Sequence, residues 1–175
     1  MAKLSDFNLI KCIYMSAGSH AGETIEQIIE RKQKEIEICG WGLWAFSSPI
    51  AKNIYEMCKN EEELFAVMPV TGEDTVGNPV TAKFYYTLDS NEKRDISSDM
   101  KVTFSGTQGY ALVVEKYFFI DDDDNIFPKS NYERRKYFNG VELLEQANES
   151  KKTKTKKKIK IIAKLKKPYI VGLTE

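Results

Sequence analysis

The residues best suited to chemistry in this sequence lie in a turn of small and polar residues, SAGSHAGET, at positions 16–24. The turn falls between a predicted buried strand and a predicted long helix, whose first N–H groups have no partner within the helix and attract anions. Glycines let the backbone approach a ligand closely, and hydroxyl and imidazole groups supply hydrogen bonds. We therefore expect ligand contacts from Ser16, Gly18, Ser19, His20, Gly22 and Thr24. The alternative is an ordinary strand-to-helix turn in which Ser19 or Thr24 caps the helix.

Known catalytic patterns do not fit this turn. A Walker A loop needs GxxxxGK[ST], but Ala17 stands at its first glycine position and Glu23 at its lysine position. His20 is the only histidine of the chain, so it cannot form a typical zinc centre alone. The sequence holds no GxSxG, HExxH or GxGxxG motif. We expect a binding protein without a cofactor; the enzymatic alternative is a phosphoester hydrolase or nuclease that uses His20 as general base, or Glu23 with a divalent ion.

The second group of interest is the aromatic segment WGLWAF at 41–46, which holds both tryptophans of the chain. If the segment is extended, side chains 41, 43 and 45 share one face, and 42, 44 and 46 share the other. One indole then packs in the core while the other lines a cavity, where stacking on a nucleobase contributes about 1–3 kcal/mol. The alternative is that Trp41 and Trp44 are both simply core residues.

Two further groups are predicted to be structural. Asp121–Asp124 and Asn125 resemble the start of an EF-hand loop, but Ile126 stands where that loop needs glycine. We therefore expect a solvated acidic loop and no metal site. The three cysteines show neither disulfide nor metal-ligand spacing and are typical of core side chains in a reduced, cytoplasmic protein; they are Cys12, Cys39 and Cys58.

Charge is balanced overall but not along the chain. Residues 151–167 hold ten lysines and no acid, whereas the rest carries 16 basic and 26 acidic residues. Apolar residues alternate with lysines from 158 to 166, which predicts an exposed edge strand with its lysines outward. The alternative is a weak nucleic-acid contact through Lys156, Lys157, Lys158 and Lys160.

The predicted elements place helices early and strands late. Periodicity indicates a helix over about 22–38 that stops before Gly40, and a second that begins at Ser47-Ser48-Pro49 and ends near Lys59. Strands are predicted at Leu9–Met15, Leu64–Val70, Val80–Leu88, Met100–Phe104, Tyr110–Ile120 and from the lysine tract to about Val171, with a short helix at Val141–Gln146. This order predicts one α+β domain over residues 1–175, with a curved antiparallel sheet or small barrel and two N-terminal-half helices packed against it. Residues 151–157 are expected to form a flexible lysine-rich loop.

Part of the chain resembles a known family. Trp41-Gly-Leu-Trp44, the following Ala51–Met57 helix and the strand at Leu64–Val70 are similar to the middle of EVE domains, which belong with ASCH and YTH domains to the PUA-like group. The resemblance covers about residues 40–90 and implies a PUA-like barrel with a pocket for a modified base or nucleotide. It assigns Trp41 and Trp44 as pocket walls. The turn at 16–24 and the Asn60–Glu63 segment depart from the family pattern.

These observations predict a module that binds a nucleotide, modified base or related phosphorylated ligand. The ligand would stack on Trp41 or Trp44, with anion contacts from the turn at 16–24. Such a module could be a reader in a defence system or could sequester a signalling nucleotide, and it is compatible with a homo-oligomer. A third reading is a protein-binding inhibitor that uses the acidic loop and the lysine strand. No apolar run approaches the roughly 18–20 residues of a membrane span.

Overall fold

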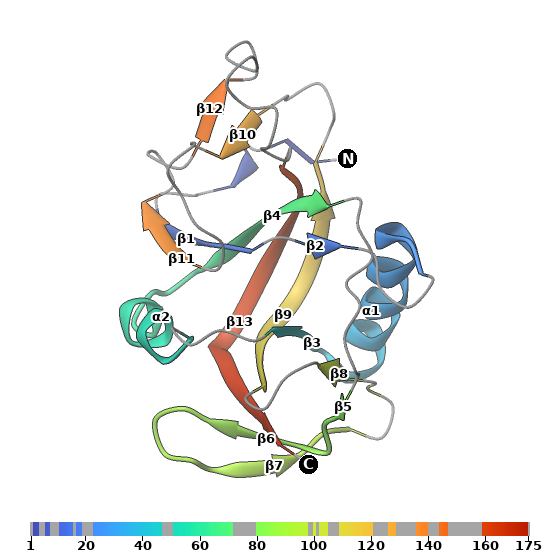
Figure 1. Ribbon diagram of the computed structural model, residues 1–175, viewed down its shortest axis with the longest axis vertical. Coiled ribbons are helices and arrows are strands. Elements are labelled where there is room, and N and C mark those ends of the chain that lie inside the picture. Colours follow the sequence, from blue (N-terminus) through green and yellow to red (C-terminus); the bar gives the residue numbers. More distant parts are fainter. Residues whose placement is uncertain are drawn as a thin grey trace.

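The computed structural model shows two helices packed on a large mixed sheet (Figure 1). It describes residues 2–3, 6–7, 11–15, 17–18, 23–46, 51–71, 80–97, 100, 102–104, 109–120, 126–128, 136–139, 144–146 and 159–174. The helices are α1 (Ile25–Cys39) and α2 (Ala51–Cys58). The strands are β1 (Lys11–Tyr14), β2 (Ala17–Gly18), β3 (Gly42–Phe46), β4 (Phe65–Thr71), β5 (Val80–Thr81), β6 (Phe84–Thr87), β7 (Lys93–Asp95), β8 (Thr103–Phe104), β9 (Gly109–Phe119), β10 (Ile126–Pro128), β11 (Lys136–Asn139), β12 (Leu144–Gln146) and β13 (Ile159–Thr174). The predicted α+β class is confirmed.

The main sheet departs from the prediction of an antiparallel sheet or barrel. Its described strands follow the order β11-β1-β4-β13-β6-β7, with β9 also paired to β13 and β3 paired to β9. The β1–β4 and β2–β4 pairs are parallel, so the sheet is mixed, and its described strands do not close into a barrel. Parallel pairing needs a crossover connection, and α1, β3 and α2 lie between β1 and β4 in the chain.

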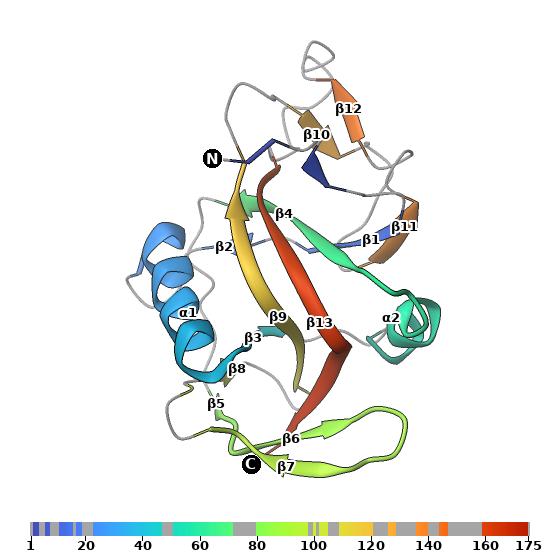
Figure 2. The same cartoon turned by 180° about the vertical axis from the view of Figure 1, so that it is seen from behind.

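Strand β13 occupies the middle of the sheet, and the prediction of an edge strand is wrong. It pairs with β4 and β6 along one side and with β9 along the other (Figure 2). Ile161 and Ala163 are fully buried as the alternation predicts, but Ile162 on the opposite face is fully buried too. Lys160 and Lys166 remain exposed. Lysines at alternate positions do not distinguish an edge from a central strand, because strand neighbours are decided by distant segments.

The long helix α1 forms where periodicity and capping predict it. Thr24 is its N-cap, and Gly40 ends it with a left-handed φ of 82° that glycine adopts without steric cost. Its predicted apolar face is buried, namely Ile25, Ile28, Ile29 and Ile36. The prediction is confirmed to within a few residues.

Other elements differ in detail. The predicted strand Val80–Leu88 is divided into β5 and β6, and Val141–Gln146 contains strand β12 instead of a helix. β12 pairs with β10, a partner that local sequence does not specify. The predicted loop at 151–157 and the acidic run at 121–124 lie outside the described residues.

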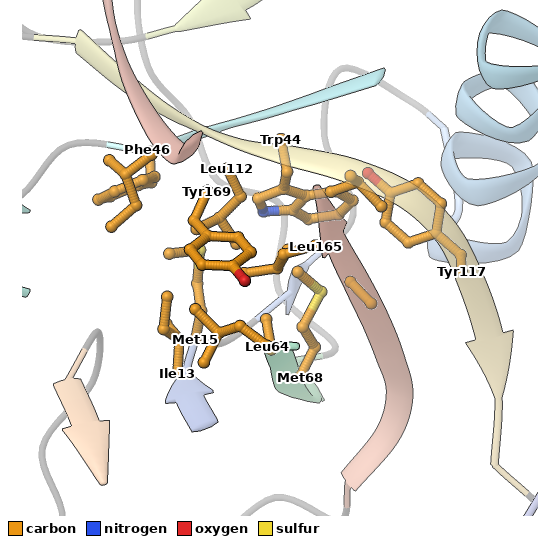
Figure 3. Packing of buried hydrophobic residues seen from close by; sticks show 14 of the residues in the cluster. Ile13, Met15, Trp44, Phe46, Leu64, Met68, Leu112, Tyr117, Leu165 and Tyr169 are labelled. Atoms are coloured by element: carbon orange, nitrogen blue, oxygen red, sulfur yellow. The ribbon is translucent and has the colours of Figure 1, made fainter. Parts of the chain in front are cut away.

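Buried side chains lie on both faces of the sheet. The larger cluster joins both helices to one face through residues such as Trp44, Leu112 and Tyr169 (Figure 3). A smaller cluster on the other face includes Leu43 and Val113. The thiols of Cys12 and Cys58 are fully buried as expected, whereas Cys39 is half-buried. Among the described residues, no helix is long and apolar enough to cross a membrane.

A close ring-on-glycine contact joins β6 to β13. Gly172 and Tyr86 are paired across the ladder, and a Cβ added at Gly172 would lie 2.1 Å from Tyr86 Cζ. We expect Gly172→Ala to displace this ring and to lower the free energy of unfolding by about 1–3 kcal/mol, measured by urea denaturation. In a Tyr86→Ala background the same substitution should lower the free energy of unfolding much less, because the ring is absent. Equal costs in the two backgrounds would contradict the contact.

Candidate functional site

The predicted turn is only partly described. Ser16, Ser19, His20 and Gly22 lie outside the described residues. Gly18 belongs to β2, where it pairs in parallel with Thr71 of β4. The turn therefore leads from the main sheet into α1, as the sequence predicts.

The described end of the turn is occupied by intramolecular contacts. The Thr24 hydroxyl accepts the Gln27 N–H at 3.2 Å, and the Gln27 side chain accepts the Thr24 N–H at 2.9 Å, which completes a capping box. Glu23 accepts two hydrogen bonds from Arg31, at 3.2 and 3.3 Å. Thr24 thus caps the helix, and the Glu23 carboxylate forms an ion pair with Arg31.

The two tryptophans lie on opposite faces of the sheet, as the alternation predicts. Trp44 is 8% exposed and belongs to the cluster beneath α1. Trp41 is half-buried on the other face, where its ring meets Tyr85 edge-on at a centroid distance of 5.4 Å. Only Trp44 therefore packs in the same cluster as the isoleucines of α1, the helix that follows the predicted turn.

Polar side chains are buried between α1 and the sheet, next to Trp44. Lys32 and Glu35 of α1 are 9% and 6% exposed, and Tyr117 of β9 is 6% exposed. The Tyr117 ring lies 6.0 Å from the Trp44 ring, centroid to centroid, and Figure 3 shows the tyrosine beside the indole. We call Lys32, Glu35, Trp44 and Tyr117 the α1 polar cluster.

Lys32 links the helix to the edge of β3. Its Nζ donates a hydrogen bond of 2.6 Å to the Leu43 carbonyl and lies 5.4 Å from the centroid of the Trp44 ring. Burial lowers the pKa of Lys32 to about 8, while the nearby Glu35 carboxylate opposes that shift. A buried ammonium is costly unless it is paired and hydrogen-bonded, and the carbonyl, the indole and Glu35 provide those partners.

Tyr117 has an unmet hydrogen-bonding requirement. Its backbone N–H donates to the Gln33 side chain at 3.3 Å, but its buried hydroxyl has no hydrogen-bond partner among the described residues. Burial, and then the charge of Glu35, raise the pKa of this hydroxyl, so it stays protonated and can donate. Burying an unpaired hydroxyl costs about 1–3 kcal/mol. Such a group is suited to a polar atom of a ligand.

Sequence reasoning missed three of these four residues, although a signal was present. Lys32 and Glu35 fall at helical spacing within the apolar face marked by Ile28 and Ile36. Charged residues at such positions are rarely buried without a specific reason. Tyr117 carried no comparable signal, because its neighbours belong to α1 and β3, far away in the chain.

The cluster combines an aromatic wall with buried donors and acceptors, which is the usual composition of a site for a small organic ligand. Among the described residues, no group of three or more His, Cys, Asp or Glu side chains is placed to hold a metal ion. No family model, curated protein or solved structure matches the chain, so the site is interpreted from its own residues.

The buried ammonium makes stability depend on pH. The pKa of Lys32 is about 8 in the folded protein against 10.5 for an unperturbed lysine. Between these values the unfolded chain binds more protons, so the contribution of Lys32 to stability rises with pH. We expect the wild type to gain up to about 3 kcal/mol relative to Lys32→Met between pH 8 and 10.5, measured by urea denaturation.

Comparing the wild type with Lys32→Met cancels the effect that other titrating groups have on the free energy of unfolding. Burial raises the pKa of the Cys12 and Cys58 thiols to about 12, which lowers stability above pH 9 equally in both proteins. Lys34→Met is the matched control, because Lys34 is exposed on the same helix. A difference between wild type and Lys32→Met that stays constant from pH 7 to 10.5 would contradict the burial of this charge.

The unpartnered hydroxyl gives a second prediction. Tyr117→Phe should leave the free energy of unfolding unchanged or raise it by up to about 1 kcal/mol, because a buried, unpaired polar group is removed. Tyr169→Phe is the control: the Tyr169 hydroxyl donates to the Glu61 carbonyl, so its loss should cost about 1 kcal/mol. Thermal and urea unfolding measure both, and a clear destabilisation by Tyr117→Phe would show that its hydroxyl has a protein partner.

Proposed function

We propose that the protein binds a small molecule containing a nucleobase, such as a nucleotide or a modified base, at the α1 polar cluster. The observation that carries this proposal is the buried Tyr117 hydroxyl beside the Trp44 indole, for which the described part of the chain supplies no hydrogen-bond partner. A heterocyclic base offers both a flat face for an aromatic wall and polar edge atoms for a buried donor. The turn at 16–24, which leads into α1, is the proposed contact for a phosphate group.

Further features are consistent with this proposal. The α+β class is the part of the PUA-like assignment that the described elements support. The finer PUA-like assignment is our proposal and rests on the resemblance at residues 40–90. Three free thiols support a reduced, cytoplasmic setting. A reader or sequestering role in a defence system follows from the same resemblance. The hydrolase alternative is weakened at Glu23, because Arg31 takes up both oxygens of that carboxylate.

Fluorescence titration tests the proposal. In a Trp41→Phe variant, Trp44 is the only tryptophan, so its emission reports on the α1 polar cluster. We expect saturable quenching by at least one member of a panel of nucleosides, nucleotides, cyclic nucleotides and methylated bases. Native mass spectrometry should show the same compound bound and chemically unchanged. Turnover of the compound would support the hydrolase reading instead.

Matched tyrosine variants locate the site. Adding Tyr117→Phe should weaken binding about tenfold, which corresponds to one lost hydrogen bond of about 1.4 kcal/mol. Adding Tyr85→Phe should change nothing, because Tyr85 lies on the other face beside Trp41. No binding by any panel member, or equal effects of the two tyrosine variants, would overturn the proposal.

A further inference from the structure

Two lysines stand directly opposite one another on the central strands. The register of the β9–β13 ladder pairs Lys116 with Lys164. Figure 2 shows these strands running side by side. Side chains at opposite positions of an antiparallel pair have Cβ atoms about 4.5–5.5 Å apart. The fold therefore places Lys116 and Lys164 side by side on one face.

This arrangement is unfavourable for the isolated protein. Like charges directly opposite in a sheet are destabilising. The Lys164 ammonium has Glu115 at 3.8 Å, an exposed and loose ion pair that contributes little. The Lys116 ammonium lies 4.9 Å from the centroid of the Phe118 ring. Further along β13, Lys166 and Lys167 are exposed as well. Exposed lysines thus gather on this part of β13, and the Glu115 carboxylate lies within ion-pair distance of Lys164.

We infer that Lys116 and Lys164 form a binding surface for the sugar–phosphate backbone of a single-stranded nucleic acid. A phosphate between the two ammonium groups would turn their repulsion into attraction and release counterions. The half-buried Phe118 ring lies next to the pair and meets the Phe7 ring edge-on at a centroid distance of 5.0 Å. Its exposed part is the proposed contact for an unpaired base. Stacking of this kind favours a single strand over a duplex or an acidic protein. This surface is independent of the α1 polar cluster.

Fluorescence polarisation with labelled dT12 and rU12 tests this surface over a range of salt concentrations. The double variant Lys116→Gln/Lys164→Gln should bind about tenfold more weakly than the wild type. Its plot of log K against log salt concentration should be shallower by about 1.4, because single strands give about 0.7 per phosphate neutralised. The control Lys34→Gln/Lys52→Gln removes two exposed helical lysines and should leave both quantities unchanged.

Other measurements decide between partners. Removing a like-charge pair should not lower the unfolding temperature, so loss of binding is not explained by unfolding. Phe118→Leu should weaken oligonucleotide binding about tenfold without changing the salt dependence. Three results would overturn the inference. One is an affinity for duplex DNA or polyglutamate equal to that for the single strands. The others are equal affinities of the two lysine double variants, and no oligonucleotide binding at all.

Discussion

The structure depends on the burial of strand β13 between neighbours on both of its edges. Buried backbone N–H and C=O groups must be hydrogen-bonded, and β4, β6 and β9 supply partners to this strand on both sides of residues 166–169. Because Ile162 and Val171 are as fully buried as Ile161 and Ile170, both faces of β13 are also covered. The position of β9, and through it of β3 and α1, follows from this one strand. The four lysines of β13 do not prevent that placement, because a long side chain lets the ammonium reach solvent, and Lys160, Lys166 and Lys167 are exposed.

Helix α1 joins the sheet through an interface that is partly apolar and partly charged. The isoleucines of α1 are buried in the core cluster, whereas Lys32 donates a hydrogen bond to the Leu43 carbonyl of β3. A methionine or leucine at position 32 would bury more apolar surface without a desolvation cost. The buried lysine, glutamate and tyrosine next to Trp44 therefore carry a cost in stability, and this is why we propose them as a recognition site.

The elements formed by local interactions could be predicted from the sequence. The first helix follows from its isoleucine spacing and from Gly40, and the alternation at 41–46 placed the two tryptophans on opposite faces. Strand β12 and the central position of β13 could not be predicted, because each depends on a partner far away in the chain. The parallel pairing of β1 with β4 has the same origin. Of the candidate site, Trp44 was predicted, while Lys32, Glu35 and Tyr117 were not.

By itself the sequence determined the spacing of apolar residues, the ends of the first helix and the alternation of side chains along strands. These features depend on residues only a few positions apart in the chain. Only the tertiary structure decided that β13 is central, that Lys116 faces Lys164, and that the Tyr117 hydroxyl lies buried beside Trp44. These pairings join segments separated by tens of residues. Their choice depends on packing and hydrogen bonding across the whole sheet, which no local pattern specifies.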